Sequence, residues 1–265
     1  MDKKLIAEKF IRLVEIVEIL RGPDGCPWDK DQTHESLLPY FLEEVYELIE
    51  SVDFNDHETF KEELGDIMLH VVLQAQIYRE NSDFTLSDSL QIVNDKLVRR
   101  HPHVFGGEKT NAAFHAKQNW EAVKHKEKNR ESRLDGVPLA LPALIRAQRL
   151  QEKAAFAGFD WEQIEQVWEK IYEELKELKQ AQSNNIKEEI ENELGDVLFA
   201  IVNLSRFLSI SAEDALRKST QKFNHRFIQV EKQLKKRGQK IDESTIDEMN
   251  EIWDMVKNKE RQRMK

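Results

Sequence analysis

Four acidic residues in the second half of the sequence stand at spacings that suit metal chemistry. Glu174 and Glu177 are three residues apart, and so are Glu193 and Asp196. On a helix, side chains three positions apart project from the same face. If the two helices that carry these pairs pack antiparallel, the carboxylates converge at the edge of the core. The same positions recur 130 residues earlier as Glu44, Glu47, Glu63 and Asp66.

Carboxylates crowded in this way repel one another unless a cation or a proton offsets their charge. A hard divalent cation is the simplest remedy, and Mg²⁺ held by carboxylates, waters and substrate phosphates suits an all-acid site. Mn²⁺ is the expected substitute. Zinc sites use His and Cys, and di-iron bundles use a Glu-x-x-His step that this sequence lacks. Acids at this spacing are also common on solvated faces, but repetition of both pairs at one offset favours the metal site.

Basic residues at helical spacing could complete the site by binding phosphates. Lys222 and Arg226 are four residues apart on one expected helical face, and Trp253 precedes Lys257 by the same step. The cations could offset the charge of a polyphosphate, while the tryptophan could stack on a base. A solvated face for the cations and a core position for the tryptophan are the plainer alternatives, and both stay open. Lys170 is a further candidate for substrate binding in this copy.

The first half of the sequence repeats these basic positions as well. Their internal spacing is kept while their offset from the second half changes, which indicates small insertions or deletions. A pattern that recurs twice in the same order predicts a duplicated structural unit. We therefore expect a second possible site in the N-terminal copy, made of the four acids there together with Lys96, Arg100, Trp120 and Lys124.

Long helices are expected to position these residues. Charged residues make up 34% of the 265-residue chain, and only 9 glycines and 6 prolines are present, which is typical of solvated helices. Apolar residues recur at steps of three and four through each acid-bearing segment. The pattern predicts an all-α fold with helices over 6–20, 37–52, 60–78, 86–100, 164–181, 190–204 and 212–236.

Two helical domains joined by a basic linker account for the repeat. The linker has four Lys or Arg among residues 126–133 and no apolar period. We expect an N-terminal helical domain over 1–125, the linker over 126–141, and a C-terminal helical domain over 142–265.

Composition narrows the classes of partner and the location. A formal net charge of −10 leaves no basic footprint over the whole chain, so direct nucleic-acid binding is not expected. The single cysteine, Cys26, excludes an intrachain disulfide framework and fits a reducing compartment. No segment approaches the ~20 apolar residues of a membrane span, and residues 1–20 lack the unbroken apolar stretch of a signal peptide. A cytoplasmic protein without membrane contact is expected.

The order Glu-x-x-Glu, a fifteen-residue spacer and Glu-x-x-Asp resembles the all-α nucleoside triphosphate pyrophosphohydrolases. Three further motifs make the chain similar to the MazG family over nearly its whole length. They are Gly25-Cys26-Pro27-Trp28-Asp29, Arg99-Arg100-His101-Pro102-His103-Val104-Phe105 and Gly158-Phe159-Asp160-Trp161. The resemblance implies magnesium-dependent hydrolysis of NTPs and dNTPs between the α and β phosphates, which yields a nucleoside monophosphate and pyrophosphate.

The same resemblance implies roles for particular residues. The acids of the C-terminal copy would ligate the metal, three cations would hold phosphates, and one tryptophan would contact the base or the ribose. In tandem members the C-terminal copy is usually taken as catalytic, and homodimers are implied in which helices from both chains complete four-helix-bundle cores. The residues concerned are Glu174, Glu177, Glu193 and Asp196 for the metal, Lys222, Arg226 and Lys257 for phosphate, and Trp253 for the nucleoside.

Several points stay open at this level. Attack by water on the α-phosphorus needs a proton acceptor, and Glu173 and Glu193 are both candidates. Asn192 stands where the first copy has Glu62, so the C-terminal site lacks one acid that the N-terminal copy has. The first copy keeps its own acids, and the sequence gives no reason to call it inactive.

Two other interpretations of function are kept. One is a nucleotide-binding regulatory protein without turnover, in which the acids hold a structural cation. The other is a narrower pyrophosphohydrolase acting on dUTP or phosphoribosyl-ATP, although such chains are usually shorter and contain a single unit. The preferred base and sugar, and the physiological role, are not determined by the sequence.

Overall fold

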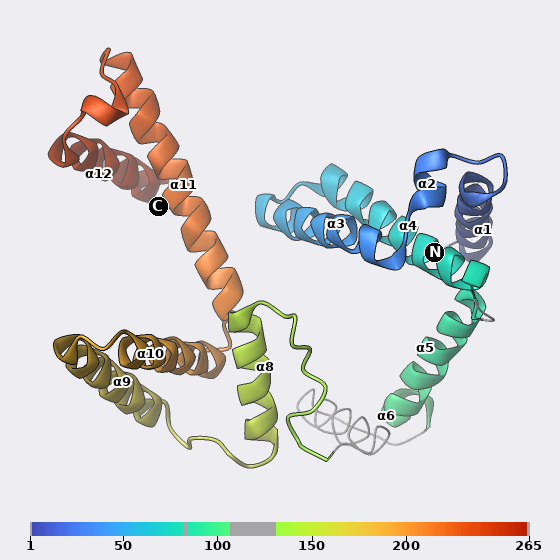
Figure 1. The fold of residues 1–265 in the computed structure, drawn as a ribbon, viewed down its shortest axis with the longest axis horizontal. Helices are drawn as coiled ribbons and strands as arrows, with labels where there is room; N and C mark the ends of the chain where they lie inside the picture. The colour runs from blue at the N-terminus through green and yellow to red at the C-terminus, as the bar shows by residue number, and fades with distance from the viewer. Residues whose placement is uncertain (1, 82–83, 107–130, 264–265) are drawn as a thin grey trace. The chain divides into compact units, whose positions relative to one another are not determined.

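A computed structural model describes residues 2–81, 84–106 and 131–263, and Trp120 and Lys124 lie outside them. All regular elements in these ranges are helices, which confirms the predicted all-α class (Figure 1). The chain divides into two units, residues 1–120 and 121–265. Each unit is described separately below.

The first unit builds its core from three helices. α1 packs on α4, which also lies along α3. Val17, Leu37 and Val72, one from each of these helices, are almost completely buried together. Full burial of such a side chain contributes roughly 1.5–3 kcal/mol. The helices of this unit are α1 (Lys3–Arg21), α2 (Pro27–Asp31), α3 (His34–Phe54), α4 (His57–Asn81), α5 (Leu86–Arg100) and α6 (Pro102–Phe105).

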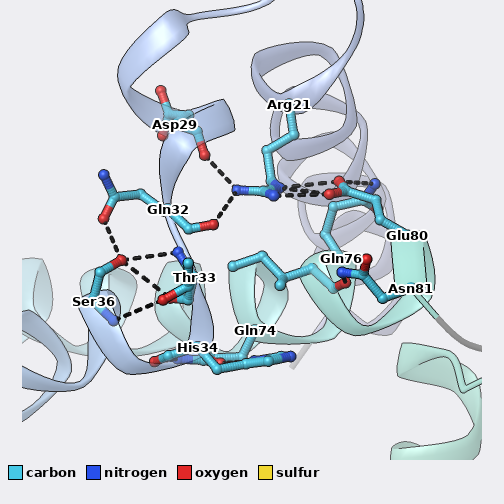
Figure 2. Close-up of polar contacts among 11 residues, drawn as sticks. Arg21, Asp29, Gln32, Thr33, His34, Ser36, Gln74, Gln76, Glu80 and Asn81 are labelled. Carbon is cyan, nitrogen blue, oxygen red and sulfur yellow. Dashed lines mark hydrogen bonds and ion pairs between the residues drawn. The ribbon is translucent and has the colours of Figure 1, made fainter.

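A buried arginine fixes how α3 enters this core. Arg21, at the end of α1, donates two hydrogen bonds to the Glu80 carboxylate of α4, at 3.0 and 2.7 Å. It also donates to the backbone carbonyls of Asp29 and Gln32, which precede α3. Figure 2 shows its guanidinium between these three partners. The arginine therefore ties together α1, α2, the start of α3 and the end of α4.

The second unit has a three-helix layer and a helical hairpin. α9 and α10 lie along each other, α8 packs on α10, and α11 pairs with α12. The hairpin has its own core of Val230, Leu234 and Ile252, each at most 1% exposed. In Figure 1, α11 extends away from the α9–α10 pair. The elements are α8 (Ala143–Phe156), α9 (Ile164–Asn184), α10 (Lys187–Phe207), α11 (Ala212–Lys236), the short 3₁₀ helix η1 (Ile241–Glu243) and α12 (Ile246–Arg263).

The duplication is visible in the helix boundaries. α9 and α10 begin 130 positions after α3 and α4. Both pairs turn on an asparagine in the left-handed region, Asn55 with φ 56° and Asn185 with φ 57°, a conformation that asparagine tolerates better than most residues. α4 is four residues longer than α10, at 25 against 21, so α11 begins only 126 positions after α5. This difference explains why Lys222 and Arg226 follow Lys96 and Arg100 by 126 positions rather than 130.

The predicted helices are present, and most extend further than the apolar pattern alone indicated. Capping residues account for part of the difference, since Thr33 and Ser36 form a reciprocal capping box that begins α3 at His34. The sequence reasoning did not name helices over 143–156 and 246–263. Residues 131–141 contain no helix, and the domain limits at 125 and 142 stay a prediction.

Among the residues that the structure describes, no single helix is long and apolar enough to span a membrane. One pair, α10 with α11, passes a combined test of length and composition, although the two helices are bent by 104°.

Candidate functional site

The acids of the C-terminal copy converge as the spacing predicted. The short connection at residues 185–186 folds α10 back along α9, so acids from both helices face one another. Carboxylate oxygens of Glu174, Glu193 and Asp196 lie within 4.8 Å of one another. Carboxylate oxygens of Glu173, Glu174 and Glu177 form a second group, and these also lie within 4.8 Å of one another. Glu174 belongs to both groups and is only 6% exposed, so it is the centre of the cluster.

A lysine provides part of the opposite charge within this cluster. The Lys170 Nζ lies 2.7 Å from a carboxylate oxygen of Glu173 and 2.7 Å from one of Glu174. These hydrogen bonds raise the pKa of Lys170 well above its ordinary value. The lysine therefore remains charged and fixes two of the acids in the absence of a metal.

Glu193 differs from the acids that Lys170 holds. Partial burial raises the pKa of Glu193, and the nearby carboxylates of Glu177 and Asp196 raise it further. A carboxylate that takes up a proton more readily than its neighbours is a better general base. The cluster thus contains one acid whose environment favours proton uptake.

The N-terminal copy holds its acids in the corresponding place. Oxygens of Glu44, Glu47 and Glu63 lie within 4.8 Å of one another, while Asp66 acts on them through its charge. Glu63 is 6% exposed, and its Oε2 has no hydrogen-bond partner among the described residues. Burial raises the pKa of Glu63, and the Glu44 carboxylate beside it raises it further. The position of Lys170 is occupied in this copy by Tyr40, so no lysine stands at the equivalent place beside these acids.

A histidine that the sequence reasoning missed lies beside the N-terminal acids. His70 is 7% exposed, and its Nε2 is 3.9 Å from Glu44 Oε1. Burial lowers the pKa of His70, while the charge of Asp66 acts in the opposite direction. Ala200 occupies the same position in the second copy. Comparison of the copies at the offset of 130 was the signal that could have found it.

The predicted phosphate-binding residues gather away from the acids of their own chain. Lys222 and Arg226 lie on α11, and Trp253 and Lys257 lie on α12. The guanidinium of Arg226 stands 5.6 Å from the centre of the Trp253 ring and forms an ion pair of 2.8 Å with Glu260. Trp253 is partly buried and packs against the hairpin core of Val230, Leu234 and Ile252. A role of these four residues in substrate binding stays a prediction.

The corresponding residues of the N-terminal copy are only partly described. Lys96 is half-buried on α5, and Arg100 at the end of that helix is 6% exposed. Because Trp120 and Lys124 lie outside the described residues, the basic part of the second possible site is described only in part.

A family model matches the chain twice. The MazG nucleotide pyrophosphohydrolase domain matches residues 32–105 and residues 162–230. The first match runs from just before α3 to α6, and the second runs from just before α9 into α11. Each includes one set of acids, which confirms the duplication, whereas Trp253 and Lys257 on α12 lie outside both matches.

Curated proteins are similar to the chain over most of their length. The nucleoside triphosphate pyrophosphohydrolase/pyrophosphatase MazG of Thermotoga maritima is 48% identical over 94% of this chain and 95% of its own. The nucleoside triphosphate pyrophosphohydrolase of Escherichia coli (strain K12) is 41% identical over 94% of this chain and 97% of its own. The uncharacterized protein YabN of Bacillus subtilis is 43% identical over 98% of this chain, which is 54% of its own length.

Proposed function

The chain belongs to the MazG family of nucleotide pyrophosphohydrolases, and we propose that it hydrolyses NTPs and dNTPs to nucleoside monophosphates and pyrophosphate. The observation that carries the proposal is the convergence of Glu174, Glu193 and Asp196 from two helices to within 4.8 Å. Acids that meet from separate helices, in a chain similar to proteins named for this reaction, support a catalytic cation site over a solvated acidic face.

The donor set of the C-terminal cluster fits Mg²⁺. All candidate ligands are carboxylates, which hard cations prefer. Burial raises the pKa of Glu193, and the nearby carboxylates raise it further. A divalent cation would offset the carboxylate charge that Lys170 leaves unbalanced. When bound, Mg²⁺ would neutralise phosphate charge and acidify a water molecule. We assign its ligands as Glu174, Glu177, Glu193 and Asp196, with Mn²⁺ as the substitute.

Glu193 is the better candidate for the proton acceptor. Glu173 already forms an ion pair of 2.7 Å with Lys170. Burial, and then the neighbouring carboxylates, raise the pKa of Glu193. Glu193 would therefore receive the proton as water attacks the α-phosphorus, and Glu173 would position Lys170.

Lys170 is placed to change partners on substrate binding. It is held by Glu173 and Glu174 when these carboxylates have no other counter-charge. Once a cation offsets the charge of Glu174, the ammonium group becomes available to a phosphate oxygen of the substrate. Lysine suits this role because it is a compact point charge on a flexible stem.

A homodimer would bring a basic surface to the acids. α9 and α10 expose large apolar side chains that the three-helix layer of α8, α9 and α10 does not bury by itself. We propose that a second copy covers this face and that the α11–α12 hairpin surface supplies Lys222, Arg226, Trp253 and Lys257 to the phosphates and nucleoside. The exposed apolar side chains of α9 and α10 are Trp168, Tyr172, Leu175, Leu194, Leu198, Phe199 and Ile201.

The single cysteine bears on where the enzyme acts, and the similar proteins bear on its range of substrates. A single cysteine, Cys26, fits a reducing compartment, and we propose that the enzyme acts in the cytoplasm on nucleotides rather than on nucleic acid. Similarity over almost the full length of relatives that are named nucleoside triphosphate pyrophosphohydrolases supports a general enzyme over a dUTP- or phosphoribosyl-ATP-specific one.

Product analysis tests the proposal directly. The purified full-length chain is incubated with each common NTP and dNTP, with Mg²⁺ and with EDTA, and the products are separated. We expect monophosphate and pyrophosphate only when Mg²⁺ is present. Diphosphate and phosphate would show cleavage between the β and γ phosphates, and absence of turnover would favour a nucleotide-binding regulatory protein.

A pair of variants tests the site. Glu193→Gln should abolish turnover, because the amide neither binds the cation as strongly nor accepts the proton. Glu191→Gln is the matched control, since this exposed residue of α10 is two positions away and lies on another face of the helix. Near-normal activity in Glu193→Gln would exclude this carboxylate from the site.

A further inference from the structure

An acidic side chain lies among the predicted substrate-binding residues of the α11–α12 hairpin. Glu260 follows Trp253 and Lys257 on α12 at steps that place all three on one face of the helix. This face is turned toward α11, because α12 folds back along α11 (Figure 1) and Glu260 bonds to Arg226 there. A carboxylate repels the phosphates of a nucleotide, so its presence among these residues requires an explanation.

Glu260 binds one edge of the Arg226 guanidinium. Nε of Arg226 donates to Oε2 of Glu260 at 2.8 Å, and Nη2 of Arg226 lies 2.8 Å from the same oxygen. The other carboxylate oxygen, Oε1, accepts from Nδ1 of His225 at 3.1 Å. The N–H groups on the opposite edge of the guanidinium are not used by this contact. Glu260 therefore fixes the plane of the guanidinium and leaves an edge that can donate to a phosphate.

The ring of Trp253 contacts the same guanidinium. The central carbon of the Arg226 guanidinium is 5.6 Å from the centre of the ring, which is within cation–π distance. Trp253 is in turn held by the hairpin core and by Phe223, whose ring centre is 5.3 Å away. A carboxylate and an aromatic ring, both from one face of α12, thus determine where the charge of Arg226 lies.

Packing of α12 on α11 does not require this ion pair. The hairpin core already buries Val230, Leu234 and Ile252, each at most 1% exposed. Glu260 follows Ile252 by eight residues, which is about two helical turns. The side chains of Arg226 and Glu260 remain 19% and 28% exposed, and ion pairs that water can reach contribute little to stability. Ordering of the arginine therefore explains the contact better than a contribution to folding.

The partners of Glu260 keep its carboxylate ionised. Burial acts to raise the pKa of Glu260, but the hydrogen bond and charge of Arg226, followed by those of His225, outweigh it and lower the pKa below its ordinary value. At neutral pH the carboxylate is therefore available to hold the guanidinium.

The sequence repeats this acid in the first copy. Glu127 follows Lys124 by three residues, as Glu260 follows Lys257, and both copies also carry the corresponding arginine. Residues 107–130 lie outside the described ranges, so this comparison is one of sequence alone. Recurrence of the acid together with the lysine and the arginine indicates that the three act together.

We propose that Glu260 is a positioning residue for Arg226, which it holds in the orientation that binds a phosphate of the substrate. Glu260 does not touch the substrate, and it acts by ordering the arginine before the substrate arrives. An arginine that is already ordered loses less conformational freedom on binding, so the substrate binds more tightly. The inference rests on the proposed function, because it assumes that Arg226 binds the phosphates of a nucleoside triphosphate.

Calorimetric titration of the full-length chain tests this role. The probes are α,β-methylene analogues of ATP, GTP, CTP and UTP with Mg²⁺, because they are not cleaved between the α and β phosphates. Glu260→Ala should weaken binding by roughly 5-fold, the loss expected when one long side chain must be ordered on binding. Glu251→Ala is the matched control, since it removes the same charge from an exposed position on the opposite face of α12.

A more conservative variant keeps the test valid if Glu260→Ala unfolds the hairpin. Glu260→Gln retains the shape of the side chain and one acceptor oxygen, so it should weaken binding in the same direction by a smaller factor. Thermal unfolding followed by circular dichroism compares both variants with the control. In steady-state kinetics the loss should fall on KM rather than on kcat, whereas a loss of folded protein would lower kcat.

A double-mutant cycle shows whether Glu260 acts through Arg226. In an Arg226→Ala background, Glu260→Ala should have no further effect on the affinity for the analogues. A second loss of the same size in that background would overturn the inference, because Glu260 would then act independently of the arginine.

The remaining outcomes separate this inference from the proposed function. Tighter binding in either Glu260 variant would overturn the inference, since the carboxylate would then compete with phosphates for Arg226. Unchanged affinity and KM would overturn it too, as would a wild-type chain that binds none of the analogues. Unchanged values with normal release of pyrophosphate would leave the proposed function standing. Weaker binding that Arg226→Ala cancels, in a chain without turnover, would support the inference and remove the proposed hydrolysis.

Discussion

The two copies place acids at the same helical positions but balance the charge of those acids differently. In the C-terminal copy, Lys170 lies 2.7 Å from two carboxylates. In the N-terminal copy the equivalent residue is Tyr40, and burial beside Glu44 raises the pKa of Glu63 instead. Each cluster contains an acid with a raised pKa, Glu193 in the C-terminal copy and Glu63 in the N-terminal copy, and the C-terminal cluster has in addition a lysine bonded to two of its carboxylates. The carboxylate spacing alone therefore does not decide how readily each copy works.

Removal of the central acid from each copy should give the largest contrast. Glu174→Ala should lower the rate of pyrophosphate release by roughly 100-fold or more, since even groups one shell outside a metal typically cost about 10–100-fold. Glu44→Ala, the matched change, should leave most of the turnover intact. Initial rates with saturating Mg²⁺ measure both. If Glu44→Ala lost as much activity, the assignment of catalysis to the C-terminal copy would be wrong.

Arg21 in the first unit and Arg206 in the second unit each bond to residues outside their own helix, and we expect them to contribute differently to the free energy of unfolding. The side chain of Arg21 is 5% exposed and bonded to Glu80 and two carbonyls, whereas that of Arg206 is 14% exposed and bonded to Asp160 and Asn203. Arg21→Gln should cost roughly 2 kcal/mol and Arg206→Gln roughly 1 kcal/mol, because more buried partners lose their bonds in the first unit. Urea unfolding curves measure both free energies. Equal losses would contradict the ranking.

An exchange of Lys170 and Tyr40 tests the charge balance. Lys170→Tyr should tighten binding of Mg²⁺ at the C-terminal site by roughly 5-fold, because removal of one positive charge is worth about 1 kcal/mol at an exposed cluster. Tyr40→Lys should weaken the N-terminal site by a similar factor. Mg²⁺ titration without nucleotide measures both affinities, since Lys170 is also a candidate for phosphate binding. Weaker Mg²⁺ binding in Lys170→Tyr would show that the lysine chiefly orders Glu174.

The smallest expected effect is the change of folding stability with pH, which depends on acids of both copies. The raised pKa values of Glu63, Glu47 and Glu193 mean that these groups hold protons more strongly in the folded chain than in the unfolded chain. Their contribution to stability is therefore complete below the ordinary value of 4.5 and is lost as pH rises through the raised values. The metal-free chain should gain a few degrees in unfolding temperature when the pH falls from 7 toward 5.

Two comparisons sharpen this prediction. Glu63→Gln should reduce the gain, because the amide has no proton to lose. Excess Mg²⁺ should reverse the trend, since bound cation favours the ionised carboxylates and protons compete with it. A metal-free chain that became steadily less stable between pH 7 and pH 5 would contradict the balance of charge described for the N-terminal copy.

Several features of the fold were predictable because they depend on local periodicity. Acids three residues apart share a helical face whatever surrounds them, so the pairing of Glu174 with Glu177 and of Glu193 with Asp196 could be read directly from the spacing. The duplication was equally visible, since the offset of 130 persists across the turn at Asn55 and Asn185. Helix ends were less predictable because caps such as Thr33, rather than apolar residues, set them.

Other features required the tertiary structure because they join residues from separate elements. The pairing of Arg226 with Glu260 depends on how α11 and α12 fold together, and the spacing of Lys222 and Arg226 gave no sign of it. A cavity lined by His34, Gln74 and His70 likewise needs α3 and α4 to be in register. The sequence by itself thus determined the helices, the repeat and the acidic faces. The partners of each charge were decided only by packing, because neutralising a charge depends on distance in space and not along the chain.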